Sequence, residues 1–142
     1  MKNKRIILDT NLWISFLISK KYNQIDTLIE NNKINLIFSN ELIQEFIEVT
    51  SRPKFKKYFS KKDIGRILNT FNEFGELINV ESNLTICRDE KDNFLLNLAM
   101  DSKADFLITG DNDLLILEKI GSTKIETFSS FKEHTKQKID ER

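Results

Sequence analysis

The amino-acid sequence predicts an α/β fold: a three-layer α/β/α sandwich with a central, mainly parallel sheet. Short apolar runs without polar–apolar alternation indicate strands that are buried on both faces. Helical patterns separate these runs along most of the chain. In a sheet of this kind, functional side chains gather beyond the carboxyl ends of the strands, at a topological switch point.

The predicted elements alternate along the chain. Strands are predicted from apolar runs at residues 5–8, 34–38, 76–80, 106–108 and 125–128. Helices are predicted at residues 12–19 and 23–31, after Ser39, after Ser60, and at 92–103. Ser39 and Ser60 are favourable N-caps, and Asp63 completes a capping arrangement with Ser60. The helix at 92–103 is expected to turn its apolar residues inward, namely Phe94, Leu95, Leu98 and Ala99.

The composition fits one globular domain. The chain has 142 residues, of which 39% are hydrophobic and 31% are charged, a balance that excludes a collagen-like or disordered chain. We expect one domain over residues 1–142, with a core at about 4–130 and a charged tail at 131–142. The apolar runs are too short for a membrane span or a signal peptide, so we expect a cytoplasmic protein.

The scarcity of cysteine and histidine excludes several kinds of site. Cys87 is the one cysteine and His134 the one histidine, so neither an intrachain disulfide nor the usual structural zinc site is expected. A Ser-His-Asp or Cys-His centre would have to use His134, near a highly charged C-terminus. The 22 basic and 22 acidic residues cancel, so the net charge indicates no particular partner.

Four acidic residues occupy compatible positions at the ends of these elements. Asp9 and Asp111 come just beyond two apolar strands, and they face the same edge if those strands are parallel neighbours. Asp92 begins a helix, and Glu45 lies about one and a half turns into the helix after residues 34–38. We therefore expect the four carboxyl groups to converge at one edge of the sheet.

A cluster of carboxylates without histidine or cysteine has a definite chemical meaning. Close like charges are stable only when they are protonated or hold cations, and Mg²⁺ and Mn²⁺ prefer oxygen ligands. Two such ions, about 4 Å apart, can activate a water and stabilise the leaving oxygen of a phosphodiester. The predicted chemistry is metal-dependent phosphoryl hydrolysis. Each acid alone also has a structural interpretation, because acidic residues cap helices and offset helix dipoles.

The segments that carry these acids resemble the PIN-domain ribonucleases. The matching segments are residues 7–11 (ILDTN), 39–46 (SNELIQEF), 88–93 (RDEKDN) and 107–114 (LITGDNDL). Their order and spacing match from about residue 4 to residue 130. Residues 52–54 and 109–111 further resemble the subgroup of toxins from toxin–antitoxin pairs that is related to the VapC toxins.

This resemblance implies a Mg²⁺- or Mn²⁺-dependent endoribonuclease whose products carry a 5′-phosphate and a 3′-hydroxyl. It implies that the catalytic and metal-binding acids are Asp9, Glu45, Asp92 and Asp111. It adds Asp113 as an accessory metal-binding acid, and Asn11 and Thr109 as residues that orient ligands or the attacking water. Asp89 is either an outer member of this set or a solvated loop charge. Family members commonly form homodimers, and toxin members are inhibited by a cognate antitoxin.

A basic segment at residues 52–66 is a second candidate surface. Its cations are Arg52, Lys54, Lys56, Lys57, Lys61, Lys62 and Arg66, against one acid, Asp63. Phe55, Tyr58 and Phe59 are interleaved, and cations with aromatic rings can bind the backbone and bases of single-stranded RNA. The alternative is a solvated, lysine-rich connection whose aromatic side chains pack inward. Trp13 is expected in the core or in a dimer interface.

Three other interpretations compete with that of a catalytic nuclease. A haloacid-dehalogenase-like phosphatase would need Asp-x-Asp, but Asn11 stands two places after Asp9. A receiver-like module would need a phosphorylatable Asp after a middle strand and a Lys after a late one, and residues 80–82 and 127–128 supply neither. A PIN-like module could bind RNA or protein without cleavage, although the presence of all four acids argues against this.

Overall fold

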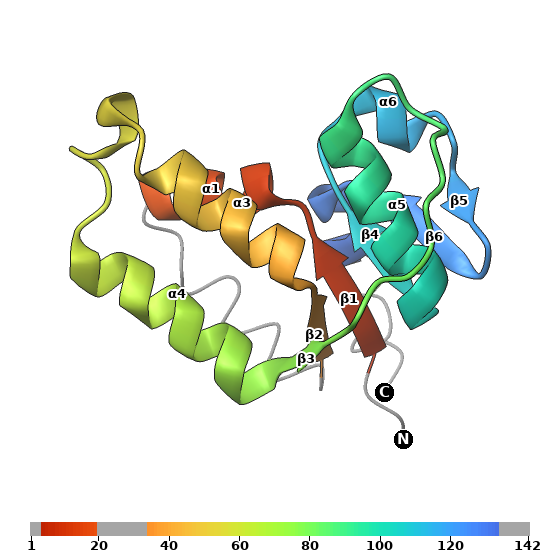
Figure 1. Ribbon diagram of the computed structural model, residues 1–142, viewed down its shortest axis with the longest axis horizontal. Helices are drawn as coiled ribbons and strands as arrows, with labels where there is room; N and C mark the ends of the chain where they lie inside the picture. Colours follow the sequence, from red (N-terminus) through yellow and green to blue (C-terminus); the bar gives the residue numbers. More distant parts are fainter. Residues whose placement is uncertain (1–3, 20–33, 134–142) are drawn as a thin grey trace.

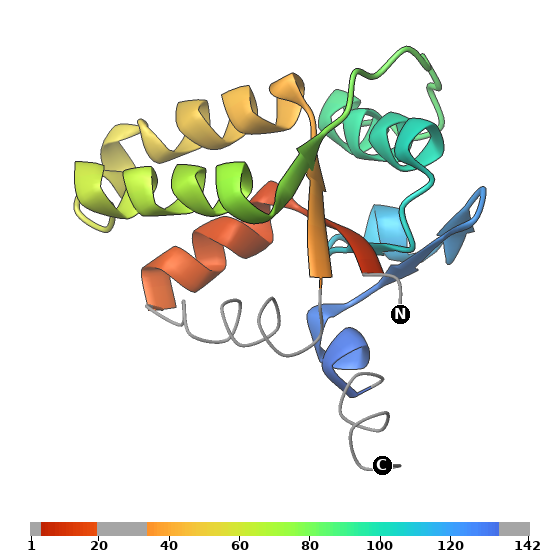
Figure 2. The same cartoon turned by 90° about the horizontal axis from the view of Figure 1, so that it is seen from below.

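The computed structural model describes residues 4–19 and 34–133, in which a six-stranded sheet has helices on both sides (Figures 1 and 2). The strands are β1 (Lys4–Leu8), β2 (Ile34–Phe38), β3 (Gly75–Leu77), β4 (Phe106–Ile108), β5 (Lys119–Ile120) and β6 (Thr123–Glu126). The helices are α1 (Thr10–Ser19), α3 (Asn40–Thr50), the 3₁₀ turn η1 (Pro53–Phe55), α4 (Lys61–Phe74), α5 (Glu90–Ser102) and α6 (Asn112–Leu115). The predicted three-layer α/β/α fold is confirmed.

The order of the strands places a topological switch point beside β1. The sheet has the order β3-β2-β1-β4-β6-β5, and every neighbouring pair is parallel except β5 and β6. The chain crosses from β1 to β2 on one side, whereas β4 pairs with the other side of β1. Leu8 is in register with Ile108, so β1 and β4 end together. The residues that follow these strands therefore emerge at one edge of the sheet.

The core explains why these strands are apolar along their whole length. Ile7, Leu107 and Ile108 are fully buried, because helices cover both faces of the central strands. Leu96 of α5 is also fully buried, and Trp13 of α1 is 1% exposed. Trp13 is thus a core residue within this chain.

The helices α3 and α4 form an arm that leads away from the sheet and returns to it (Figure 1). The Oγ of Ser39 accepts the Leu42 N–H at 3.2 Å and caps α3, as predicted. At the start of α4, Ser60 and Asp63 form the predicted capping box, with bonds of 3.1 and 3.2 Å. The connection between the two helices, which contains η1, lies at the end of the arm that is remote from the sheet.

Two predicted strands have different bounds in the structure. The strand predicted at 76–80 is β3, Gly75–Leu77; after Ile78 donates to the Phe38 carbonyl oxygen, the chain leaves the sheet for α5. The strand predicted at 125–128 is β6, Thr123–Glu126, and residues 128–133 are helical. The short elements α6 and β5 were not predicted, because four and two residues carry no detectable periodicity.

One inward-facing residue was predicted wrongly, and some predictions lie outside the described residues. Phe94 is 40% exposed, because α5 turns buried polar side chains toward the preceding segment. The helix predicted at 23–31, His134 and the rest of the tail lie outside the described residues. Phe131 is described and buried, with its ring 5.3 Å from that of Phe106. Across residues 4–19 and 34–133, no helix combines the length and apolarity that crossing a membrane would require.

Candidate metal centre

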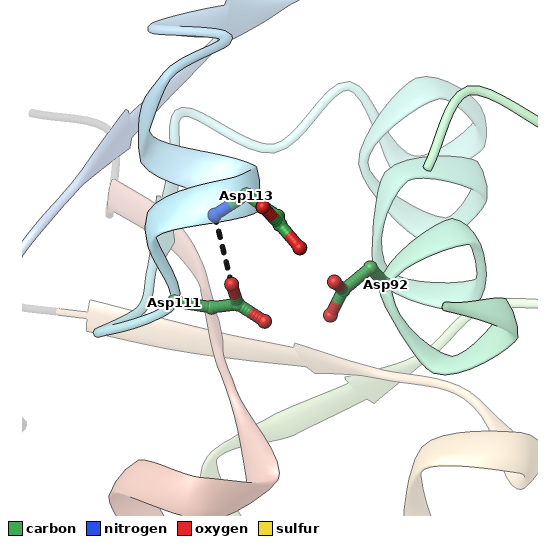
Figure 3. A group of neighbouring side chains, drawn as sticks. All are labelled: Asp92, Asp111 and Asp113. Carbon is green, nitrogen blue, oxygen red and sulfur yellow. Dashed lines mark hydrogen bonds between the residues drawn. The ribbon is translucent and has the colours of Figure 1, made fainter. Parts of the chain in front are cut away.

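Three aspartates meet beyond the carboxyl ends of β1 and β4. Asp92 of α5, Asp111 at the start of α6 and Asp113 within α6 each offer one carboxylate oxygen, and these oxygens lie within 4.8 Å of one another. Figure 3 shows the three carboxyl groups directed into a common space. Asp92 is 6% exposed, Asp111 is half-buried and Asp113 is exposed. We call these three residues the acidic cluster.

Helix capping accounts for only part of this arrangement. Asp111 is the N-cap of α6, and one of its oxygens accepts the Asp113 N–H at 2.8 Å. Its other oxygen points toward Asp92 (Figure 3). The N-cap of α5 is the exposed Asp89, which accepts the Lys91 N–H at 3.0 Å. Because Asp89 takes the capping role, the carboxyl group of Asp92 is left for the acidic cluster.

Asp9 is tied to the acidic cluster through Thr109. One oxygen of Asp9 accepts the Asn11 N–H at 3.2 Å, and the other accepts the Thr109 hydroxyl at 2.7 Å. The Thr109 oxygen in turn accepts the Asp111 N–H at 3.0 Å. Both Asp9 and Thr109 are buried, whereas the Asn11 side chain is exposed. The parallel register of β1 and β4 is what brings these residues of distant sequence together.

Glu45 approaches the same region from α3. It lies outside the three-residue cluster and is half-buried. Burial raises the pKa of its carboxyl group, the nearby Lys91 lowers it, and Asp9 and Asp89 raise it further. Because Asp9 raises the pKa of Glu45, the acid of α3 lies in the neighbourhood of the acid that follows β1.

The electrostatics of this region favour protonated carboxyl groups. Burial, repulsion by Asp111 and a hydrogen bond to Asp111 raise the pKa of Asp92 to about 7. Burial also raises the pKa of Asp9, although its bonds from Thr109 and Asn11 act in the opposite direction. A divalent cation would offset the repulsion that produces these shifts. An all-oxygen set of carboxylates fits Mg²⁺ or Mn²⁺.

Comparison with known proteins agrees with this geometry. The sequence model of the PIN domain family matches residues 5–113, which include Asp9, Glu45 and the three aspartates of the acidic cluster. This chain belongs to the PIN domain family. It is also 37% identical over 116 residues to an uncharacterized protein of Methanocaldococcus jannaschii, a match that covers 80% of this chain and 74% of that protein. PIN domains are generally metal-dependent nucleases, and they usually bind divalent metals.

In this PIN domain, three polar side chains of α5 hold the segment that leads to the acidic cluster. Asn93, Asn97 and Asp101 are spaced four residues apart and share one side of the helix. The Asn93 amide accepts the N–H groups of Ile86 and Cys87 at 3.0 and 2.8 Å and donates to the Cys87 carbonyl oxygen at 2.9 Å. The Asn93 side chain thus supplies the backbone hydrogen bonds that a neighbouring strand would supply if this segment were still in the sheet.

The other two side chains act in the same way further along α5. Asn97 accepts the Leu84 N–H at 2.7 Å and donates to the Leu84 carbonyl oxygen at 3.4 Å. Asp101 accepts the N–H groups of Glu81 and Ser82 at 2.6 and 2.8 Å. Sequence reasoning missed this role. The signal was present, since Asn97 interrupts the apolar run at 94–100 and lies four residues from both Asn93 and Asp101.

Arg88 is a second residue that sequence reasoning did not single out. Its guanidinium lies 3.5 Å from the Asp113 carboxylate, and its side chain is 91% exposed. Asn93 holds the backbone of the preceding residue, Cys87, and this fixes the position of the Arg88 backbone. The signal was its place directly before Asp89, within one of the matching segments.

The basic segment of this PIN domain lies apart from the acidic cluster, at the remote end of the α3–α4 arm (Figure 1). Arg52 follows α3 and pairs with Glu48 at 3.4 Å. Phe59 is buried and the partly buried Phe55 packs beside it, with tilted rings whose centroids are 5.8 Å apart, as predicted by the alternative in which the aromatic side chains pack inward. Tyr58 differs, because 42% of it is exposed.

Proposed function

We propose that this PIN domain is an endoribonuclease that uses Mg²⁺ or Mn²⁺ to hydrolyse phosphodiester bonds of RNA. The observation that carries the proposal is the buried carboxyl group of Asp92, held against Asp111 and Asp113 with a pKa raised to about 7. A cation bound between carboxyl groups that repel one another would stabilise their charged forms, and such perturbed groups are typical of functional sites.

The acidic residues divide into groups by their surroundings. Asp92, Asp111 and Asp113 would hold the metal, because their oxygens already converge. Asp9 and Glu45 would complete the catalytic set from the neighbouring β1 and α3. When bound, the metal would lower the pKa of a water and stabilise the leaving oxygen of the phosphodiester.

Thr109 and Asn11 would orient Asp9 rather than bind metal themselves. The Thr109 hydroxyl donates to one oxygen of Asp9, and the Asn11 backbone N–H donates to the other. Both bonds stabilise the charged form of Asp9 against the effect of burial. They also restrict the rotation of the carboxyl group, which is how residues around a metal site commonly act.

The biological setting is part of the proposal. Residues 52–54 and 109–111 resemble toxins of toxin–antitoxin pairs, so we propose a cytoplasmic toxin that is inhibited by a cognate antitoxin and forms a homodimer. On that basis, expression of the chain alone should arrest growth of a host cell. Growth should continue when Asp9→Asn is expressed to the same level.

The experiment that tests the reaction is cleavage of end-labelled, single-stranded RNA with Mn²⁺ or Mg²⁺. The wild type should cleave, EDTA should stop cleavage, and renewed metal should restore it. Mapping of the ends should show 5′-phosphates and 3′-hydroxyls. Asp9→Asn should be inactive, whereas Glu73→Gln, which alters an exposed acid on α4, should retain activity. Cleavage that survives both EDTA and Asp9→Asn would reject the metal mechanism, and binding without any cleavage would indicate a non-catalytic module.

A further inference from the structure

We propose that the basic segment, residues 52–66, is a docking surface for single-stranded RNA, separate from the acidic cluster. The inference rests on the proposed function, because it names where the substrate of that site would extend. It also stands on observations at a different part of the molecule. These are the local charge, the placement of two lysines on α4, and the exposure of one aromatic ring.

The charge of the segment is large, and ion pairs among the described residues leave its five lysines unneutralised. Seven cations and one acid give residues 52–66 a formal charge of +6 in a chain whose net charge is zero. The one acid, Asp63, is engaged in the capping box with Ser60. Lys54, Lys56, Lys57, Lys61 and Lys62 are exposed, and none forms an ion pair within the described part of the chain. A polyanion would find these charges available.

Lys61 and Lys62 lie at a position where their positive charge destabilises α4, the helix that they begin. Lys61 and Lys62 begin α4, a helix of 14 residues. The N-terminus of a helix carries partial positive charge, so cations there are unfavourable and anions are favourable. An anion bound in front of α4 would be attracted by both the lysines and the helix terminus. Stability alone therefore does not account for these two residues.

The exposed ring of Tyr58 favours single-stranded RNA over duplex RNA as the ligand. Tyr58 is 42% exposed, and the Nζ of Lys57 lies 5.1 Å from the centre of its ring. An aromatic ring flanked by cations can stack on an unpaired base while the cations contact phosphates. Bases in a duplex are already stacked and offer only their edges. The surface thus fits a single strand better than a duplex, and one tyrosine among lysines offers little apolar area for a membrane.

The position of the segment allows one strand to reach both regions. Glu45 and Arg52 are seven residues apart along α3 and its C-terminal end, which corresponds to about 10 Å along a helix axis. Figure 1 shows α3 running from the edge of the sheet to the connection before α4. An RNA strand cleaved at the acidic cluster could therefore follow α3 and meet the basic segment.

The test compares two triple variants with the same change in charge. The first is Lys54→Gln, Lys56→Gln and Lys57→Gln. The matched control is Lys103→Gln, Lys119→Gln and Lys124→Gln, which neutralises exposed lysines outside the arm. Binding of a labelled single-stranded RNA is measured by fluorescence anisotropy in EDTA. The first variant should bind about tenfold more weakly, and its log–log salt slope should fall by about 2, at roughly 0.7 per cation.

Two substitutions of Tyr58 test the stacking role. Tyr58→Leu should weaken binding about five- to tenfold without a change in the salt slope, because a stacking contact is lost and no cation is removed. Tyr58→Phe keeps the ring and should bind like the wild type. Equal losses for Tyr58→Leu and Tyr58→Phe would reject stacking, and so would an unchanged affinity for Tyr58→Leu.

The outcomes separate this inference from the proposed function. Equal weakening in both triple variants, or none in either, would overturn the inference. Tighter binding to duplex RNA, or to phosphatidylserine vesicles with no preference for RNA, would overturn it as well. If the first variant loses binding while the wild type never cleaves, only the proposed function fails. If the wild type cleaves and the first variant binds normally, only this inference fails.

Discussion

The acidic cluster lies on α5 and α6, whereas the basic segment lies at the end of the α3–α4 arm that is remote from the sheet, and the two regions differ in burial, charge and sequence spacing. The acids of the cluster come from α5 and from the start of α6, and Asp92 is buried. The cations lie within one short segment of the sequence, residues 52–66, and the lysines among them are exposed. Burial strengthens electrostatic interactions, so a few acids perturb one another strongly while many surface lysines coexist. The net charge of zero hides two opposite excesses that different parts of the fold keep apart.

This contrast indicates that the two regions suit different ligands. A partly buried group of carboxyl groups that repel one another suits a cation of high charge, which is bound tightly and in fixed geometry. An exposed row of lysines suits a long polyanion, which is bound through many weak and salt-sensitive contacts. Substitutions at one region should therefore leave the other region's property nearly intact.

The largest expected effect is the loss of cleavage in Asp92→Asn. The amide removes a carboxylate from the acidic cluster, so the rate of RNA cleavage should fall beyond the roughly 10- to 100-fold loss seen when a residue only orients a metal ligand. RNA affinity measured in EDTA should stay within about twofold of wild type, since the lysines are untouched. Initial rates of RNA cleavage measure the first effect, and fluorescence anisotropy in EDTA measures the second. A matching loss of affinity would show that the two regions are not separable.

The second effect is an inverse dependence of stability on pH in the metal-free protein. Asp92 has a pKa of about 7 when folded, against an ordinary aspartate pKa of 3.8. Between these values the folded state holds a proton that the unfolded state has released, so rising pH favours unfolding. The raised pKa values of Asp9 and Glu45 act in the same direction. The melting temperature without metal should therefore be lower at pH 8 than at pH 5, by at least about 4 °C.

Two controls sharpen the pH prediction. Mn²⁺ should restore stability at pH 8, because it binds the deprotonated acidic cluster of the folded state. Asp92→Asn should flatten the pH dependence, whereas the Lys54, Lys56 and Lys57 triple variant should retain it. Thermal scans with and without EDTA measure both. A melting temperature that rises steadily from pH 5 to pH 8 without metal would contradict the assigned shift.

A smaller effect should separate Asn93 from Asn97. Each amide binds the backbone of the segment before α5, so Asn93→Ala and Asn97→Ala should each lower the free energy of unfolding by about 1–3 kcal/mol. Only Asn93→Ala should also weaken Mn²⁺ binding, because Asn93 is adjacent to Asp92 and anchors Cys87 beside Arg88. Urea unfolding and Mn²⁺ titration provide the two measurements. Equal Mn²⁺ affinities in the two variants would reduce Asn93 to a purely structural role.

The smallest effect concerns the stability of α4. Lys61→Glu replaces a cation with an anion at the helix N-terminus, which should raise the free energy of unfolding by about 0.3–1 kcal/mol. The same change should weaken RNA binding, because it introduces repulsion of phosphates. Urea unfolding and anisotropy would show the opposite signs. If Lys61→Glu neither stabilised the protein nor weakened binding, the conflict between helix stability and RNA binding would be absent.

Much of the fold and part of the candidate site could be predicted from local patterns. The apolar runs at 5–8, 34–38 and 106–108 coincide closely with β1, β2 and β4, because strands buried on both faces need unbroken apolar sequence. The caps Ser39 and Ser60 were recognisable for a similarly local reason. The bounds of β3 and β6 were not, since partners distant in sequence decide where a short strand ends.

Within the site, residue types were predictable but their contacts were not. The acidic side chains beyond β1 and β4 indicated a shared edge, and the parallel register of those strands brought Asp9 and Thr109 into contact. The amides of Asn93 and Asn97 could be taken from sequence as solvent-facing positions. In the structure they are buried, while Phe94 between them is exposed. The physical reason is that the backbone N–H and C=O groups of the segment before α5 must be hydrogen-bonded, and the two amides supply these bonds.

The sequence by itself determined the class of fold, the family and the identity of the acidic and basic residues, because periodicity, capping and motif spacing are local properties of the chain. Tertiary structure alone decided which acids share a cluster and why the pKa of Asp92 rises to about 7. It also decided that Tyr58 faces outward while Phe59 does not. The physical reason is that burial and repulsion depend on distances between elements, and these distances exist only once β1, β4 and α5 have packed together.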